Sequence, residues 1–172
     1  RNSGTIKADG VVVGQHGAIL FKATKTATLD TGRAVTASGA QGGKIDIKAQ
    51  GVLQAGTVSA NGSTGSGGAV NVEATSSVIQ TASAITSANG ATSGGSVRVS
   101  AAPGGQVFTS GTLSATGAQG GEVQVLGGNV ALVAAHVDAS GAAGGGSILV
   151  GGDYQGGGSA PHADKTYVNF SS

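Results

Sequence analysis

The chain has 172 residues, of which 34 are glycine, 10% are charged and 3% are aromatic, and it contains no cysteine, methionine or tryptophan. A net charge of +1 with so few charged residues excludes the dense basic surface that nucleic-acid binding needs, and no apolar run is long enough to span a membrane. The glycines lack the every-third-residue spacing of collagen, and 38% of residues are hydrophobic, which argues against disorder.

A Gly-Gly pair followed by an alternating apolar segment recurs along the whole chain. The copies begin at His16 (a degenerate copy), Gly42, Gly67, Gly94, Gly120 and Gly145. Successive copies start 26, 25, 27, 26 and 25 residues apart. A steady period in this range is typical of proteins in which each repeat stacks on the next. We therefore predict a single domain over residues 1–172, made of about six coils of roughly 26 residues.

The segment after each Gly-Gly pair predicts a β-strand. Its two apolar columns contain only β-branched and aromatic residues, which strands favour, and alternation turns both columns to the same side. These columns are Ile19, Ile45, Val70, Val97, Val123, Ile148 and Phe21, Ile47, Val72, Val99, Val125, Val150. The column between them faces the other way and has no common chemistry, as expected for a solvated face: Leu20, Asp46, Asn71, Arg98, Gln124, Leu149.

Two further strand-like segments complete each repeat. The second is marked by Leu29, Leu53, Ile79, Phe108 and Leu132, and the third by Ile6, Val35, Val58, Ile85, Leu113 and Val137. Turns such as Ala60-Asn61-Gly62 follow the third, because glycine accepts positive φ and the short polar side chain caps the backbone locally. Three short strands and three corners predict one coil of an all-β parallel β-helix, with coils about 4.8 Å apart. A sandwich of hairpins gives no reason for identical columns at one period, and no 3.6-residue stripe indicates a helix.

The last coil departs from the pattern in an irregular loop at residues 151–165. This loop carries our candidate ligand-binding residues, Asp153, Tyr154, Gln155, His162, Asp164 and Lys165. Long loops in a compact solenoid are usually functional or mobile, and a tyrosine ring can stack on a sugar. Asp153, His162 and Asp164 together would suit a metal ion, but solvated loop residues explain them more simply. We predict no metal and no cofactor.

The ionisable residues do not predict an enzyme. A polysaccharide lyase or hydrolase needs acidic and basic side chains that converge on neighbouring coils, whereas Asp46 stacks under Asn71 and then Arg98. The three histidines fall in different coils without acidic partners at matched positions. No nine-residue Gly and Asp period indicates a calcium-binding repeat. No outward column stays threonine from coil to coil, which argues against ice binding.

The repeat resembles the filamentous-haemagglutinin-like exoproteins, which are two-partner-secretion adhesins of Gram-negative bacteria. The resemblance rests on the Gly-Gly-x-Val-x-Val-x-Ala strands and x-Val-x-Ala-x-Gly corners. The segment Gly151-Gly152-Asp153-Tyr154-Gln155-Gly156, with Pro161, Ala163 and Thr166-Tyr167-Val168, is also similar to one that recurs in large biofilm-matrix adhesins of that family.

This resemblance implies a right-handed parallel β-helix that is part of a much longer shaft. Such a shaft is secreted to the cell surface or extracellular matrix through an outer-membrane pore partner, and it attaches cells to each other or to matrix exopolysaccharide, without catalysis. Three other functions stay open. Some relatives are passive stalks that present a distal toxin or receptor-binding domain. The second alternative, which the ionisable residues favour less, is a polysaccharide lyase or hydrolase. The third is a fibre that self-associates through terminal coils, whose strands expose unpaired edges.

Overall fold

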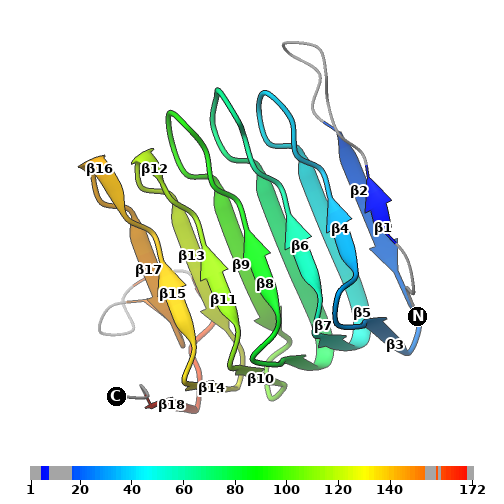
Figure 1. Cartoon of the computed structure of the whole chain (residues 1–172). Coiled ribbons are helices and arrows are strands. Elements are labelled where there is room, and N and C mark those ends of the chain that lie inside the picture. Colours follow the sequence, from blue (N-terminus) through cyan, green and yellow to red (C-terminus); the bar gives the residue numbers. More distant parts are fainter. Residues whose placement is uncertain (1–4, 8–16, 154–157, 159, 170–172) are drawn as a thin grey trace.

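The structure is a computed structural model, and it describes residues 5–7, 17–153, 158 and 160–169. The described residues contain strands and no helix, and every strand pair is parallel. The strands stack as a β-solenoid of about five turns (Figure 1). The sequence predicts about six, but the last repeat contributes only β17 and β18 to the described residues.

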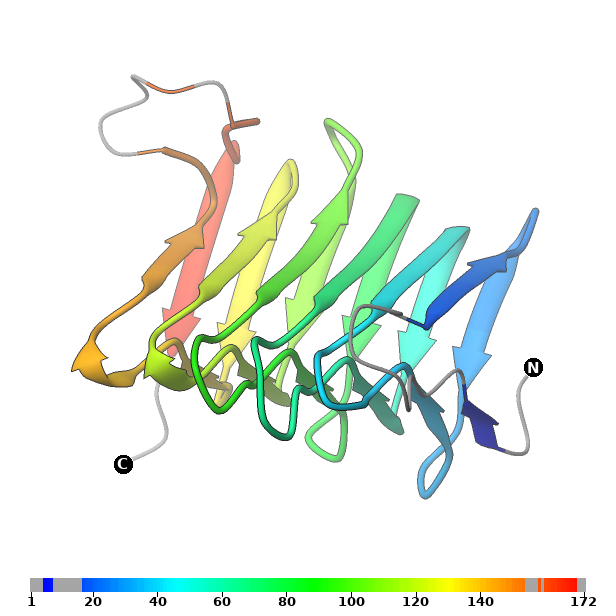
Figure 2. The same cartoon turned by 90° about the horizontal axis from the view of Figure 1, so that it is seen from above.

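Three faces run along the solenoid. The first face contains β2 (Ala18–Lys22), the first parts of β5 (Lys44–Gln54) and β7 (Ala69–Gln80), β9 (Ser96–Ala101), β13 (Glu122–Leu126) and β17 (Ser147–Val150). The second face contains β3 (Thr26–Leu29), the later parts of β5 and β7, β10 (Gln106–Thr109), β14 (Asn129–Val133) and β18 (Lys165–Asn169). The third face contains β1 (Thr5–Lys7), β4 (Ala34–Thr36), β6 (Thr57–Ser59), β8 (Ile85–Ser87), β11 (Thr112–Ser114) and β15 (His136–Asp138). Two corner strands, β12 (Gly117–Gln119) and β16 (Gly141–Gly144), also pair. Seen from above, the strands of each face lie side by side along one axis (Figure 2).

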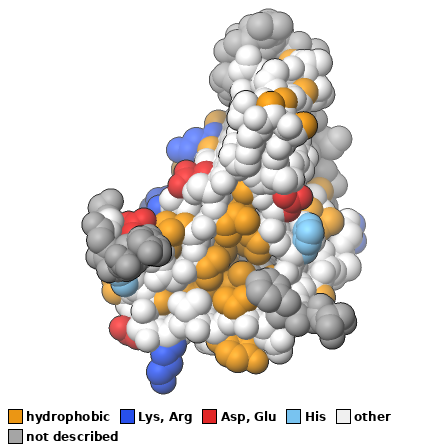
Figure 3. All heavy atoms as spheres, turned by 90° about the vertical axis from the view of Figure 1, so that its left-hand side faces the viewer, with side chains coloured by type: hydrophobic (Ala, Val, Ile, Leu, Met, Phe, Trp, Pro, Cys, Tyr) orange, Lys and Arg blue, Asp and Glu red, His pale blue; other side chains and the backbone are white. Residues whose placement is uncertain are grey.

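The first-face prediction is confirmed residue by residue. Ile45 pairs with Val70, Val70 with Val97, and the column continues to Val123 and Ile148. The four inner members of this column are fully buried. Ile148 is exposed because no coil covers it (Figure 3 views this end of the stack, where apolar side chains gather).

The second-face prediction mixes two columns and is wrong in part. Leu53 pairs with Ile79, and Ile79 with Phe108, but this column faces outward, with Leu53 39% exposed and Ile79 41% exposed. The buried columns lie one residue to either side: Ala27, Val52, Val78, Val107, Val130 and Leu29, Gln54, Gln80, Thr109, Leu132. A shift of one residue reverses the face of every side chain in a strand.

The third-face prediction fails at one coil. Val58 pairs with Thr86 and Thr86 with Leu113, so Thr86 occupies the core position that we assigned to Ile85. Thr86 is fully buried, whereas Ile85 is 43% exposed. The reason is the polar core that surrounds Thr86, where a hydroxyl has partners that an isoleucine would not use.

Two stacked glutamines and Thr86 form this polar core. Gln54 Nε2 donates to the carbonyls of Gly56 (3.2 Å) and Ile85 (3.1 Å) and to Thr86 Oγ1 (3.0 Å). Gln80 Nε2 donates to Gln54 Oε1 (2.9 Å) and to Thr86 Oγ1 (3.0 Å). These bonds replace most of those that the buried amides lose from water, and of the amide atoms only the Gln80 Oε1 has no partner among the described residues. The network also fixes the register of two neighbouring coils, since a slip would break several bonds at once.

One member of the buried column stands outside this network. Thr109 pairs with Gln80 in the register and is fully buried, yet its Oγ1 has no hydrogen-bond partner among the described residues. We therefore expect Thr109→Val to raise the free energy of unfolding by about 1 kcal/mol, because it removes a desolvated, unpaired hydroxyl at nearly constant volume. The matched change Thr86→Val should lower it by about 1–2 kcal/mol. Urea unfolding of both variants checks this prediction. If both substitutions changed the free energy of unfolding in the same direction, the prediction would be contradicted.

The corner prediction is wrong in two respects. The corner glycines Gly39, Gly62, Gly90, Gly117 and Gly141 do not have positive φ, and the polar residues Ser38, Asn61 and Asn89 bond to the next coil rather than locally. The Asn61 N–H donates to Ser38 Oγ (3.0 Å), the Asn89 N–H to Asn61 Oδ1 (2.8 Å), and the Thr116 N–H to Asn89 Oδ1 (2.9 Å). Each side chain thus accepts from the backbone of the coil that follows it. The corners add a ladder of side-chain bonds to the backbone ladders of the three faces.

Candidate functional site

The outward side chains of the first face form a polar surface. Alternation places valines and isoleucines inside and turns the intervening positions of β5, β7, β9 and β13 outward. Ser100 and Leu126, at the ends of β9 and β13, are nevertheless buried. Register then aligns Asp46 with Asn71, Arg98 and Gln124, as predicted. A parallel column aligns Lys48 with Glu73, Ser100 and Leu126. Four coils therefore contribute neighbouring polar groups to one surface.

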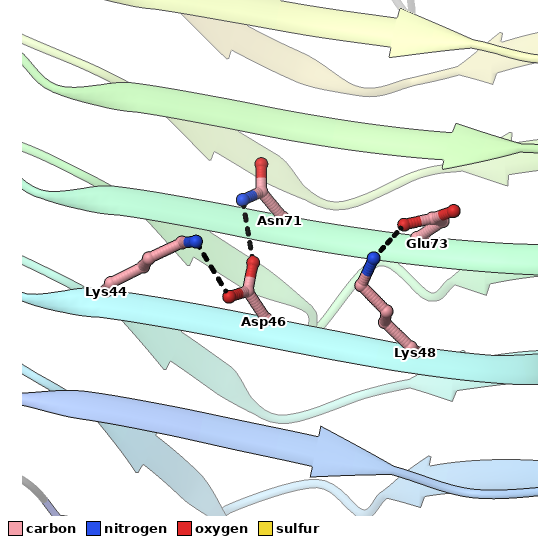
Figure 4. A network of polar contacts seen from close by, with 5 residues as sticks. All are labelled: Lys44, Asp46, Lys48, Asn71 and Glu73. Carbon is pink, nitrogen blue, oxygen red and sulfur yellow. Dashed lines mark hydrogen bonds and ion pairs between the residues drawn. The ribbon is translucent and has the colours of Figure 1, made fainter.

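Ion pairs and hydrogen bonds connect the polar groups of β5 and β7 (Figure 4). Lys44 Nζ lies 3.0 Å from Asp46 Oδ2, and Asn71 Nδ2 donates to Asp46 Oδ1 over 2.8 Å. Lys48 Nζ lies 2.8 Å from Glu73 Oε2 on the next coil. The sequence predicts no common chemistry for this column, whereas the structure shows a connected network across coils.

The network shifts the proton affinity of two of its members. Burial alone would raise the pKa of Asp46, but the hydrogen bonds from Asn71 and Lys44 and the charges of Lys44 and Lys48 lower it overall. The hydrogen bond to Glu73, together with its charge, raises the pKa of Lys48. Both groups are thus held in their charged forms at neutral pH.

A second polar cluster spans β9 and β13. Arg98 Nη1 donates to Gln124 Oε1 over 2.8 Å, and Gln124 Nε2 donates to Glu122 Oε1 over 2.6 Å. A guanidinium carries five N–H donors, and the bond to Gln124 uses one of them. Arg98 therefore retains donors for a ligand that approaches the first face.

Three adjoining hollows follow this surface and make one groove. A hollow of about 340 Å³ contains Asp46, Asn71 and Arg98, with Pro103 and Pro161 as walls. A second, of about 290 Å³, shares Arg98 and Pro161 with the first, and a third, of about 230 Å³, shares Lys48 and Glu73 with it. We call this surface the first-face groove, lined by Asp46, Lys48, Asn71, Glu73, Arg98, Glu122 and Gln124.

The irregular loop contributes to one end of the first-face groove. Asp153, a predicted site residue, lines the second hollow together with Arg98. Its Oδ2 accepts a hydrogen bond of 2.9 Å from the Ala160 N–H, which closes the loop on itself. Gly151 and Gly152, with φ of 77° and 134°, lead the chain into this loop in a conformation that other residues rarely adopt.

Of the other predicted site residues, the structure describes His162, Asp164 and Lys165. Tyr154 and Gln155 lie outside the described residues. The Asp164 N–H donates to the Gly128 carbonyl (2.7 Å), and Lys165 begins β18 on the second face. His162 is exposed beside Gly152. Within the described ranges, no three His, Cys, Asp or Glu side chains lie close enough to hold a metal ion.

The groove side chains suit binding of a hydroxyl-rich ligand. Amides, carboxylates and a guanidinium offer directional donors and acceptors along several coils, and most charges already have a partner in the protein. Asp46, Asn71, Arg98 and Gln124 were visible in the sequence as one column, but their mutual hydrogen bonds were not. Among the described residues, no helix has the length and apolarity needed to cross a membrane. No family model, curated protein or solved structure matches this chain.

Proposed function

We propose that this chain is a shaft segment of a secreted bacterial surface adhesin, and that the first-face groove attaches it to a matrix exopolysaccharide. The observation that supports this most is the groove itself, in which hydrogen-bonding side chains of successive coils line three connected hollows. A polymer lying along the solenoid axis would meet a hydrogen-bonding side chain of the Asp46, Asn71, Arg98 and Gln124 column once per coil, about every 4.8 Å. Many weak contacts of this kind add up to firm attachment.

The remaining parts of the proposal come from the resemblance to filamentous-haemagglutinin-like exoproteins. They are a right-handed solenoid with about six coils, export through an outer-membrane pore partner, and a location on the surface or in the matrix of a Gram-negative bacterium. The loop residues Asp153, Tyr154, Gln155, His162, Asp164 and Lys165 belong to the proposed ligand-binding region. The protein acts without catalysis in this proposal, because adhesion needs only equilibrium binding.

Binding of the chain to a panel of bacterial exopolysaccharides tests the proposal, and Arg98→Gln is the decisive variant. We expect saturable binding to at least one polymer and a loss of about 10-fold or more in the variant, because a charge-assisted hydrogen bond contributes about 1.5–3 kcal/mol. Arg33→Gln is the matched control, since Arg33 is exposed in the corner between the second and third faces. Binding by Arg33→Gln should equal that of the wild type.

Tyr154→Ala extends the same experiment to the irregular loop at residues 151–165. Weaker exopolysaccharide binding by this variant would show that the loop belongs to the binding region. Equal binding by wild type and Arg98→Gln would remove the groove from the proposal. A chain that binds no polymer would support the alternative of a passive stalk that presents a distal toxin or receptor-binding domain.

A further inference from the structure

An apolar column runs along the outside of the second face. Register aligns its members in successive coils: Thr28, Leu53, Ile79, Phe108, Ala131 and Tyr167. Leu53, Ile79 and Tyr167 are 39%, 41% and 58% exposed, and the other three are half-buried. We call this column the second-face ladder. A contiguous exposed apolar surface of this kind marks an interaction site more often than scattered apolar residues do.

The outward column on one side of the second-face ladder carries almost no charge. The neighbouring outward column consists of Thr26, Gly51, Ser77, Gln106, Asn129 and Lys165, in which the lysine at the end is the one charged residue. The first face, in contrast, carries Lys44, Asp46, Lys48, Glu73 and Arg98. The partner that fits the ladder is therefore flat and uncharged. Its features must repeat at the strand spacing of about 4.8 Å to meet each rung.

We propose that the second-face ladder packs against the same ladder of a second copy of this chain, around a two-fold axis that runs along the strand direction between the rungs of Ile79 and Phe108. This arrangement reverses the order of rungs in the partner. Leu53 then lies opposite Ala131, and Thr28 lies opposite Tyr167, so that a large side chain meets a small one on both sides of the axis. A parallel arrangement would set Tyr167 against Tyr167 and Ala131 against Ala131, which leaves uneven gaps. The size order along the ladder thus favours a two-fold axis along the strands over one along the solenoid, which would set each rung against its own copy.

The area of the ladder sets the strength of the contact. Six rungs at about 4.8 Å and a strand width of four residues at about 3.3 Å give a face of roughly 380 Å² per copy. A stable dimer buries about 800 Å² per partner. Association of this segment is therefore weak, and it should be measured at chain concentrations near the millimolar range. The inference concerns a different face from the groove and does not rest on the proposed polysaccharide binding.

Site-directed cross-linking tests the arrangement, because the chain has no native cysteine. Packed sheets lie about 10 Å apart, beyond the reach of a disulfide, so we would use a short bis-maleimide. Leu53→Cys and Ala131→Cys should cross-link when the two variants are mixed, and neither should do so alone. In the proposed arrangement, the two copies of residue 53 are offset by three rungs, or about 14 Å along the solenoid axis. This separation is why Leu53→Cys should not cross-link to itself. Leu20→Cys is the control, since Leu20 is 68% exposed on the first face and should not cross-link to Ala131→Cys.

Sedimentation of Phe108→Thr gives a second measurement that does not depend on cysteine. Threonine keeps the strand preference while removing the central ring, so the folded variant should stay monomeric where the wild type dimerises. Cross-linking of Leu53→Cys with itself would overturn the two-fold arrangement. A wild type that stays monomeric at millimolar concentration would overturn the inference, and if Phe108→Thr then loses polysaccharide binding, the ladder is part of a ligand site instead.

Discussion

Gly68→Ala is expected to lower the free energy of unfolding by at least about 3 kcal/mol and to leave little folded protein. Gly68 is the second glycine of its pair and sits where two coils touch. A Cβ atom there would overlap the Gly43 carbonyl oxygen and would also meet the backbone of Gly42. Both obstacles are backbone atoms of a paired coil, so relief requires the coils to separate. Circular dichroism and urea unfolding measure the loss.

Gly145→Ala is the matched control for this prediction. Gly145 occupies the first position of a Gly-Gly pair at the end of the stack, and a Cβ atom there meets nothing within 4 Å. Alanine should therefore change stability by less than about 1 kcal/mol at this position. If the two variants were equally stable, close approach between coils would not be the reason for the glycine pairs.

Gln54→Leu should lower the free energy of unfolding by about 2–3 kcal/mol, although leucine fits the column well at Leu29 and Leu132. The change leaves the amide of Gln80 and the hydroxyl of Thr86 short of partners inside the core. A buried polar group without a partner costs about 1–3 kcal/mol. Urea unfolding, with hydrogen exchange at the neighbouring coils, measures the loss and locates it.

A combined variant distinguishes the effect of lost hydrogen bonds from the effect of altered packing in this polar core. Gln54→Leu, Gln80→Leu and Thr86→Val together remove all three hydrogen-bonding partners and leave Thr109 as the one polar member of the column, so stability should recover most of the loss. The three changes act on one network, and their separate effects should not add. Additive losses would show that packing, and not hydrogen bonding, explains the glutamines.

The first strand of each repeat was predictable because its chemistry is uniform. Ile45, Val70 and Val97 are all β-branched, so only one register places them together in the core. The second strand was harder, because Leu53 and Ile79 look like core residues and are outside, while Gln54 and Gln80 look like surface residues and are inside. Hydrophobicity alone cannot predict a buried amide whose partners come from other coils.

The alignment of the candidate-site residues in one column was predictable from the sequence, but the contacts between their side chains were not. The period of 26 residues aligned Asp46 with Asn71, but a hydrogen bond between them depends on side-chain conformation, which the period does not contain. The hollows also depend on Pro103 and Pro161, which come from irregular segments outside the repeat. Asp153 was chosen from the loop composition, and the structure places it at the groove together with Arg98.

The corner bonds give the stack a direction. Ser38, Asn61 and Asn89 each accept a backbone N–H from the coil that follows, and none of these bonds runs the other way. A coil that has already formed thus presents a ready acceptor to the next coil. A chain that emerges amino end first can therefore add one coil at a time onto a completed template, so that growth is vectorial and each step uses only residues that have already appeared.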